Sequence, residues 1–315
     1  MTVSDTTKVA AIQHAPVFLD RERSIEKACD LIAEVGKQKT RLAVFPEAFI
    51  PGYPCWVWKV AAGETKIIEA LHAELLMNSV DVPSDATAKL RRAAKQAKTF
   101  VVIGINERNT EASGETLYNS LLYISDEGEI MGCHRKLIPT GGERIVWGRG
   151  DGSTLDVYDL SIGRLGGLIC WENYMPLARY TMFAAGTQIY VAPTWDSSES
   201  WLATLRHIAV EGRCYVIGCC SAVNKGDIPE RFEFRERFGE WINAGRSAIV
   251  DPRGKFIAGP VEKQEEILYA DIDLTEVHRL RWELDAAGHY ARPDVFRLTV
   301  NRNPQSIIES STEYE

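Results

Sequence analysis

The 315-residue chain is long enough for one large α/β domain or two small ones, and its 45% of hydrophobic residues suffices for a sizeable core. The formal net charge is −8 and the Lys and Arg residues are interspersed, which disfavours nucleic acid or an anionic membrane as a partner. A small-molecule substrate is favoured instead. No long linker, repeat or low-complexity tract divides the sequence, so we expect one main domain.

The N-terminal residues and the spacing of the cysteines predict the cellular compartment and the use of cofactors. The polar start MTVSDTTK and the lack of 18 consecutive apolar residues predict neither a signal peptide nor a transmembrane helix, so we expect a cytoplasmic protein. Seven cysteines without CxxC spacing indicate neither a disulfide framework nor a zinc site. No HExxH or G-x-S-x-G motif occurs, and we expect no metal and no cofactor.

Hydrophobic periodicity predicts alternating elements in the first half of the chain. Residues 8–13 predict a strand, and an apolar stripe over 21–35 predicts a helix with Asp20 as its N-cap and Gly36 past its end. Further along, the pattern predicts a strand at 41–45, helices at 64–77 and 85–97, a strand at 99–105, and a hairpin with arms at 117–125 and 129–136.

The second half continues the alternation, which places the chain in the α/β class. A helix is predicted to begin near Pro176, and Cys219 and Cys220 fall in an apolar run and are expected to pack in the core. The strands are predicted at 164–169, 188–192, 214–220 and 267–273, with a helix at 200–212 and a hairpin at 244–260 around residues 251–254.

Three reactive side chains follow predicted strands. Cys170 stands at a strand-to-helix turn, Glu47 follows the strand that ends at Phe45, and Lys136 ends the second arm of the hairpin. Ligands bind beyond the carboxyl ends of strands in open α/β sheets. A thiol needs a base to take its proton and a cation to favour the thiolate, and Glu47 and Lys136 supply those two groups. Taken singly, each residue has an ordinary structural explanation.

Around these residues the sequence resembles the nitrilase superfamily of carbon-nitrogen hydrolases. The similar segments are FPEAFIPGYP, HRKLIPT, CWENYMPLARY, APTWD, HIAVEGRCYVIG, GRSAIVDPRGKFIAGP and GHYARPDVF. The resemblance implies Glu47 as general base, Lys136 as stabilising cation, Cys170 as nucleophile and Glu143 as a second glutamate that orients the lysine and the substrate. It also implies a four-layer α-β-β-α sandwich.

The residues after the cysteine suggest the reaction. The run CWEN looks like the nitrile-hydrolysing branch, which implies hydrolysis of an organic nitrile, with water, to the carboxylic acid and ammonia. The alternatives are an aliphatic amidase or carbamoyl hydrolase, a nitrile or cyanide hydratase that releases amide, and a non-catalytic scaffold relative. Many bacterial and fungal members carry a histidine where this chain has Gly141, so the pocket shape there departs from the pattern.

Aromatic residues near the catalytic segments are candidates for the pocket wall. We expect substrate contacts from the aromatic residues Tyr53, Trp171 and Trp195 and from the neighbouring Glu172 and Asn173. Three further aromatic residues nearby are candidates either for the pocket wall or for the hydrophobic core, namely Trp56, Trp147 and Tyr174.

The resemblance also predicts assembly. Family members pair across a helix-containing surface, so we expect a homo-oligomer, either a dimer or a higher assembly such as a spiral, with contacts from residues 201–213. We assign residues 1–281 to the hydrolase domain and residues 282–315 to a C-terminal extension at the oligomer interface.

Overall fold

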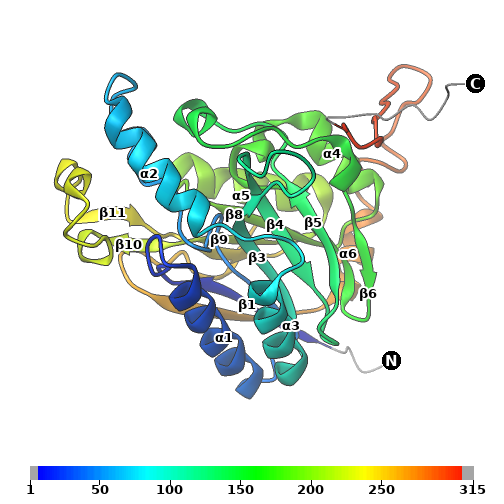
Figure 1. Cartoon of the computed structure of the whole chain (residues 1–315). Helices are drawn as coiled ribbons and strands as arrows, with labels where there is room; N and C mark the ends of the chain where they lie inside the picture. Colours follow the sequence, from blue (N-terminus) through cyan, green and yellow to red (C-terminus); the bar gives the residue numbers. More distant parts are fainter. Residues whose placement is uncertain (1–5, 307–315) are drawn as a thin grey trace, which may run out of the picture.

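The computed structural model describes residues 6–306 of the chain. Residues 1–5 of the predicted hydrolase domain and residues 307–315 of the predicted C-terminal extension lie outside the described residues. Two six-stranded sheets lie face to face, with helices outside them (Figure 1). In strand order the first sheet contains β14 (Glu266–Ile272), β1 (Thr7–Gln13), β2 (Leu42–Val44), β3 (Phe100–Arg108), β4 (Leu117–Ile124) and β5 (Ile130–Arg135). The second contains β13 (Phe256–Ala258), β12 (Ala248–Val250), β9 (Tyr215–Cys220), β8 (Ile189–Thr194), β7 (Gly163–Gly167) and β6 (Tyr158–Leu160).

The remaining regular elements surround these sheets. A small sheet pairs β10 (Ala222–Asn224) with β11 (Trp241–Ala244). The α-helices are α1 (Arg21–Lys37), α2 (Thr65–Met77), α3 (Asp85–Ala97), α4 (Pro176–Ala184), α5 (Glu199–Gly212) and α6 (Leu274–Arg281). The 3₁₀ turns are η1 (Cys55–Trp58), η2 (Gly141–Ile145), η3 (Gly152–Thr154), η4 (Cys170–Tyr174), η5 (Lys225–Asp227) and η6 (Glu233–Arg237).

Side-chain alternation along the strands builds the four layers. In β1, Val9 and Ala11 pack between the two sheets, whereas Ala10 and Ile12 face α1 and α3. In β8, Val191 belongs to the core between the sheets, whereas Tyr190 packs with α4 and α5 on the other side. Successive strand residues point to opposite faces, so each sheet is buried on both sides. The α-β-β-α sandwich implied by the resemblance is confirmed.

The first helix confirms one predicted boundary and corrects the other. The Asp20 carboxylate accepts a hydrogen bond from the Arg23 amide and caps α1, as expected. The helix continues to Lys37, so the prediction that Gly36 lies past its end is wrong. A Cβ on Gly36 would lie only 2.8 Å from the Ala97 Cβ of α3. The glycine therefore allows close helix packing and does not terminate the helix.

Several predicted strands also differ in extent from the observed ones: the strand predicted at 164–169 ends at Gly167, and the one predicted at 188–192 continues to Thr194. Strand β3 runs three residues beyond the predicted end at Ile105, because it pairs with the whole of β4 as far as Leu117. The predicted hairpin over residues 244–260 is confirmed as β12 and β13, but Ala244 belongs to β11 in the small sheet. Pairing with β4 sets the end of β3, and pairing with β10 sets the limit at Ala244.

An aromatic cluster closes one end of the sandwich. Leu71 and Leu75 of α2 pack there with Phe18, Trp56 and rings of the 225–240 segment. Phe18 meets the edge of Trp56 at a centroid distance of 6.0 Å. This packing fixes the chain on either side of Tyr53, which belongs to the same cluster.

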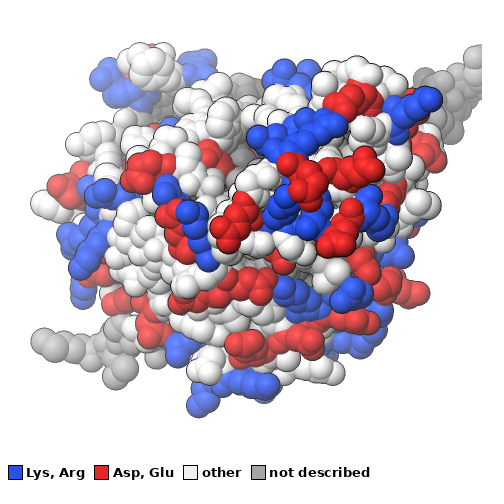
Figure 2. All heavy atoms as spheres, turned by 90° about the vertical axis from the view of Figure 1, so that its left-hand side faces the viewer, with Lys and Arg blue, Asp and Glu red and all other residues white. Residues whose placement is uncertain are grey.

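The surface and the helices bear on possible partners. On the face shown in Figure 2, acidic side chains lie among the basic ones over most of the surface. Within residues 6–306, none of the helices combines the length and the apolar character needed to span a lipid bilayer. Over the same residues, His, Cys, Asp and Glu side chains form no group of three or more that could hold a metal ion.

Candidate active site

Strand direction brings the predicted catalytic residues to one end of the sandwich. Strands β2 and β3 are parallel, and two antiparallel pairings from β3 through β4 make β5 run the same way. Glu47 follows β2 and Lys136 follows β5, so both lie at the same edge of the first sheet. Cys170 follows β7 of the second sheet. Because the sheets are stacked, the three side chains converge.

Lys136 lies between two carboxylates and is almost completely buried. Its Nζ donates to Glu47 Oε1 at 2.9 Å and to Glu143 Oε2 at 2.7 Å. All three residues are 1% exposed. Burial alone would lower the pKa of Lys136, but the negative charges of its partners raise it, so the amine remains an ammonium.

The second glutamate is held by a further set of donors. Glu143 lies in η2 and also accepts hydrogen bonds from the Thr140 amide and, at 2.7 Å, from the Tyr53 hydroxyl. Trp58 Nε1 donates to that hydroxyl at 3.1 Å. Both oxygens of Glu143 are therefore engaged, and its geometry is fixed by two different segments.

Glu47 occupies a tight turn against β3. A Cβ on Gly104 would lie 2.3 Å from the Pro46 carbonyl oxygen, so only glycine lets the turn approach this strand. Ala48 has a φ of 50° in the same turn. Burial raises the pKa of Glu47, while the Lys136 charge opposes this effect. A carboxylate with a raised pKa is suited to exchanging protons.

Cys170 is the first residue of η4 and has a φ of 51°, a left-handed conformation uncommon outside glycine. Its Sγ accepts a hydrogen bond from Thr194 Oγ1 at 3.1 Å. Burial raises the pKa of the Cys170 thiol, the Glu47 charge adds to this, and Lys136 and Thr194 act in the opposite direction. The resting group is therefore a thiol, and its proton must leave as it attacks.

A pocket of about 240 Å³ opens onto the thiol. Its aromatic wall includes Tyr53 and Trp195, whose rings stack at 4.3 Å. Trp171 is half-exposed and donates from Nε1 to Asp196 Oδ2 at 2.8 Å. The lining residues are Tyr53, Trp58, Thr140, Glu143, Cys170, Trp171, Trp195 and Asp196.

Glu172 does not line this pocket, contrary to the expected substrate contact. It is fully buried, and its carboxylate accepts hydrogen bonds from the amides of Leu137 and Ile169, each at 2.7 Å. These amides neighbour Lys136 and Cys170, so Glu172 ties together the two segments that carry them. His134 Nε2 lies 3.2 Å from the same carboxylate.

Asn173 is likewise buried and bonded within the protein. Its side-chain amide donates to the carbonyl oxygens of Leu168 and Cys170 and accepts from the Tyr190 hydroxyl. Asn173 therefore supports the cysteine turn from behind, and neither it nor Glu172 is proposed further as a substrate contact.

The other aromatic candidates divide between core and rim. Trp56 is buried in the aromatic cluster, and Trp147 packs edge-on against Tyr53 without lining the pocket. Tyr174 contacts the Trp171 ring at the exposed rim. Sequence reasoning missed Trp58, Thr194 and Asp196, although the last two lie within the APTWD segment singled out earlier.

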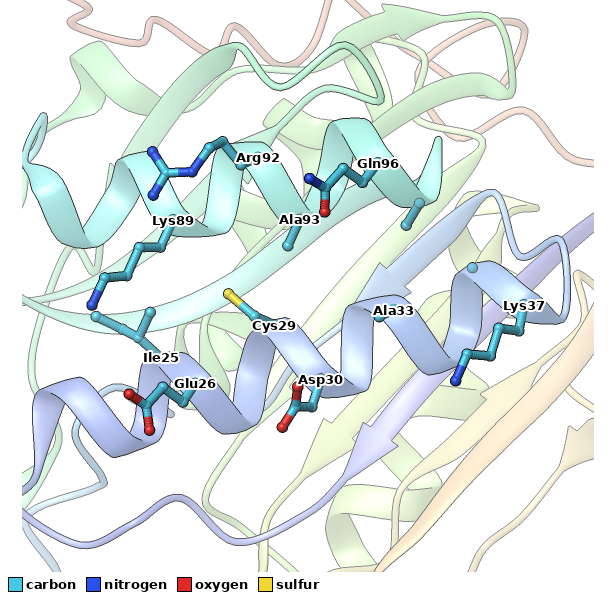
Figure 3. Close-up of a pocket in the computed structure, with 12 residues that line it drawn as sticks. Ile25, Glu26, Cys29, Asp30, Ala33, Lys37, Lys89, Arg92, Ala93 and Gln96 are labelled. Carbon is cyan, nitrogen blue, oxygen red and sulfur yellow. The ribbon is translucent and has the colours of Figure 1, made fainter.

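A larger concave region lies elsewhere, between α1 and α3. It measures about 850 Å³, and Figure 3 shows the Cys29 thiol directed toward α3, with charged side chains such as Asp30 and Lys89 around the groove. Burial raises the pKa of Cys29, and this groove holds no carboxylate-lysine cluster like that beside Cys170. The chemistry therefore points to the smaller pocket.

A buried thiol beside a carboxylate-bound ammonium, on an α-β-β-α sandwich, fits a hydrolase that uses a cysteine nucleophile. A sequence profile of carbon-nitrogen hydrolases matches residues 8–281. The chain is 43% identical to an aliphatic nitrilase of Sinorhizobium fredii (strain HH103), over 96% of this chain and 97% of that protein. It therefore belongs to the carbon-nitrogen hydrolase family and, within it, to the nitrilase branch.

One further relative and one solved structure are also similar to this chain. The chain is 38% identical to a bifunctional nitrilase/nitrile hydratase of Nicotiana tabacum, over 98% of this chain and 91% of that protein. The crystal structure of Saccharomyces cerevisiae Nit3, a member of branch 10 of the nitrilase superfamily, superposes with a TM-score of 0.71 at 21% identity, covering 90% of this chain and 96% of that one. That likeness concerns the fold.

Proposed function

We propose that this protein is a nitrilase, which hydrolyses an organic nitrile to the carboxylic acid and ammonia with Cys170 as nucleophile. The observation that carries the proposal is the Glu47–Lys136–Glu143 cluster, bonded at 2.9 and 2.7 Å, beside a thiol that opens into a pocket. The nitrilase relatives support the same reaction. The amidase, carbamoyl hydrolase and scaffold alternatives are not favoured.

The first half of the reaction forms a covalent intermediate. Cys170 Sγ attacks the nitrile carbon while Glu47 takes the thiol proton and passes it to the nitrile nitrogen, giving a thioimidate. Negative charge that develops at the reacting atoms is stabilised by the fixed Lys136 ammonium. The Thr194 hydroxyl stabilises the sulfur as it gains charge.

The second half decides the product. Water, activated by Glu47, adds to the thioimidate and gives a tetrahedral intermediate. Protonation of its nitrogen by Glu47 expels ammonia and leaves a thioester, which a second water hydrolyses to the acid; expulsion of the sulfur instead releases an amide. Glu143, bonded to Lys136 at 2.7 Å, helps to hold the intermediate in the orientation that favours ammonia loss.

We expect acid and ammonia as the main products, with amide as a minor one. Chromatography after complete consumption of a nitrile, together with an ammonia assay, measures the ratio. Predominant amide would mean a hydratase. Rapid amide hydrolysis without nitrile turnover would instead identify the protein as an amidase.

The pocket wall suggests which nitriles to test. Four aromatic rings line a volume of about 240 Å³, whereas its charged lining groups are the carboxylates Glu143 and Asp196. Apolar walls with few polar groups favour an uncharged substituent on the nitrile. The assay panel therefore compares aliphatic, aromatic and arylacetonitriles with nitriles that carry a carboxylate, which we expect to be poor substrates.

We propose in addition that the chain is a cytoplasmic homo-oligomer whose C-terminal extension, from residue 282, contributes to contacts. All seven cysteines are free thiols, which suits a reducing compartment. The extension exposes Trp282 and Phe296 at 84% and 77%, and a groove of about 1170 Å³ separates it from α4. Exposed apolar side chains in such number favour a protein interface.

Light scattering at micromolar concentration is expected to give a dimer or a larger species, because a stable interface buries on the order of 1,600 Å². Phe296→Asp should shift the mass toward smaller species, since it places a charge in the interface. Met77→Asp, at a similarly exposed site on α2, is the control and should not change the mass. A fully active monomer would contradict the proposal.

A further inference from the structure

The carboxylate of Glu47 also accepts a hydrogen bond from a side chain of strand β4. Asn119 lies in β4 and is 1% exposed. Its Nδ2 donates to Glu47 Oε1 at 2.7 Å, and its backbone carbonyl accepts from the Lys136 amide at 2.8 Å. One residue thus contacts both the base and the segment that carries the cation.

The hydrogen bonds divide the two oxygens of Glu47 into unequal roles. Oε1 accepts from Lys136 Nζ and from Asn119 Nδ2. A carboxylate oxygen has about two lone-pair sites, so these donors saturate it. Oε2 is buried and has no hydrogen-bond partner among residues 6–306. It is the oxygen with free lone pairs for a proton.

Lys136 alone would not enforce this division. The terminal torsion of a glutamate side chain is broad and roughly two-fold, so a carboxylate held by one ammonium can exchange its two oxygens. A second donor of fixed direction on the same oxygen prevents the exchange. The orientation of the Asn119 amide is itself determined, because its reverse would set Oδ1 against the carboxylate oxygen.

We propose that Asn119 is a positioning residue of the reaction, which together with Lys136 occupies Glu47 Oε1 and reserves Oε2 for proton exchange with Cys170 and water. The proposal rests on the proposed function of Glu47. It also predicts an effect on the base, because the Asn119 bond lowers the pKa of Glu47 against the effect of burial. Loss of this bond therefore moves the proton-accepting limb to higher pH.

The test compares Asn119→Ala and Asn119→Leu with Ser120→Ala. Ser120 is the matched control, since it is the next residue of β4, is buried, and donates at 2.6 Å to the carboxylate of Glu107 outside the site. Both Asn119 variants should lose kcat by about tenfold or more with KM changed by less than about twofold, and the acid limb of their pH profile should move upward. Ser120→Ala should keep the wild-type profile.

A second readout does not depend on nitrile turnover. The rate of Cys170 alkylation by iodoacetamide, followed on its peptide by mass spectrometry, should show the same upward shift in pH in the Asn119 variants. Asn119→Leu keeps a branched side chain of similar size and adds no carboxylate beside Glu47, so it serves if Asn119→Ala does not fold. An unshifted acid limb in both readouts, or equal losses in Ser120→Ala, would overturn the proposal. A wild-type chain inactive on nitriles would refute the function, yet alkylation would still test Asn119.

Discussion

Cys170→Ala is expected to abolish nitrile turnover while leaving the fold intact, because every covalent step of the proposed reaction passes through this sulfur. Alanine removes one atom from a pocket wall and a hydrogen bond to Thr194, neither of which holds sheets or helices together. The measurement is ammonia release together with thermal unfolding. Mass spectrometry of the wild type with a slow substrate should show the adduct on the peptide that contains Trp171.

Two other thiols provide the control for that experiment. Cys219 and Cys220 are buried in β9, and Cys219 Sγ donates hydrogen bonds to the carbonyl oxygens of Ile12 and Val44. Replacement of either by alanine should retain most of the activity, since neither lines the pocket. Turnover by Cys170→Ala would refute the assignment of the nucleophile.

Lys136→Met is expected to lose both activity and stability. The substitution keeps an unbranched chain of similar length but leaves Glu47 and Glu143 as buried carboxylates without their cation. Breaking a buried pair in this way typically costs about 3–5 kcal/mol. The rate should fall by about 10²-fold or more, because the fixed charge at the reacting atoms is lost. Ammonia release and thermal unfolding measure the two effects.

A double variant separates the two contributions. Lys136→Met combined with Glu143→Gln removes one of the unpaired charges and should recover part of the stability but none of the activity. Lys89→Met serves as the surface control, because the pair of Lys89 with Glu22 is solvent-exposed and should matter little. Wild-type kcat in Lys136→Met would contradict the role of the ammonium.

The sequence allowed the main elements to be predicted because their signals are local. The Asp20 cap, the apolar stripe of α1 and the turn between β4 and β5 each depend on residues close together in the chain. The positions of Glu47, Lys136 and Cys170 after strands also follow from local patterns. Their convergence required the resemblance to a known family.

Other features depend on distant contacts and could not be predicted. Gly36 looked like a helix terminator because the approach of Ala97 is invisible in the sequence. The substrate contact predicted for Glu172 is not found, because its carboxylate turns inward to amides beside Lys136 and Cys170. Asn119 carried one signal, a polar residue in an apolar strand, which alone does not reveal its partner.

The charges that line the pocket affect the release of the product. A nitrile arrives neutral, whereas the acid formed from it is an anion at neutral pH. Glu143 and Asp196 line the pocket, and the nearby Lys136 is already paired with two carboxylates. The product therefore faces like charges without a free counter-ion among the lining groups. We expect repulsion to hasten its departure, so that accumulating acid inhibits the enzyme only weakly.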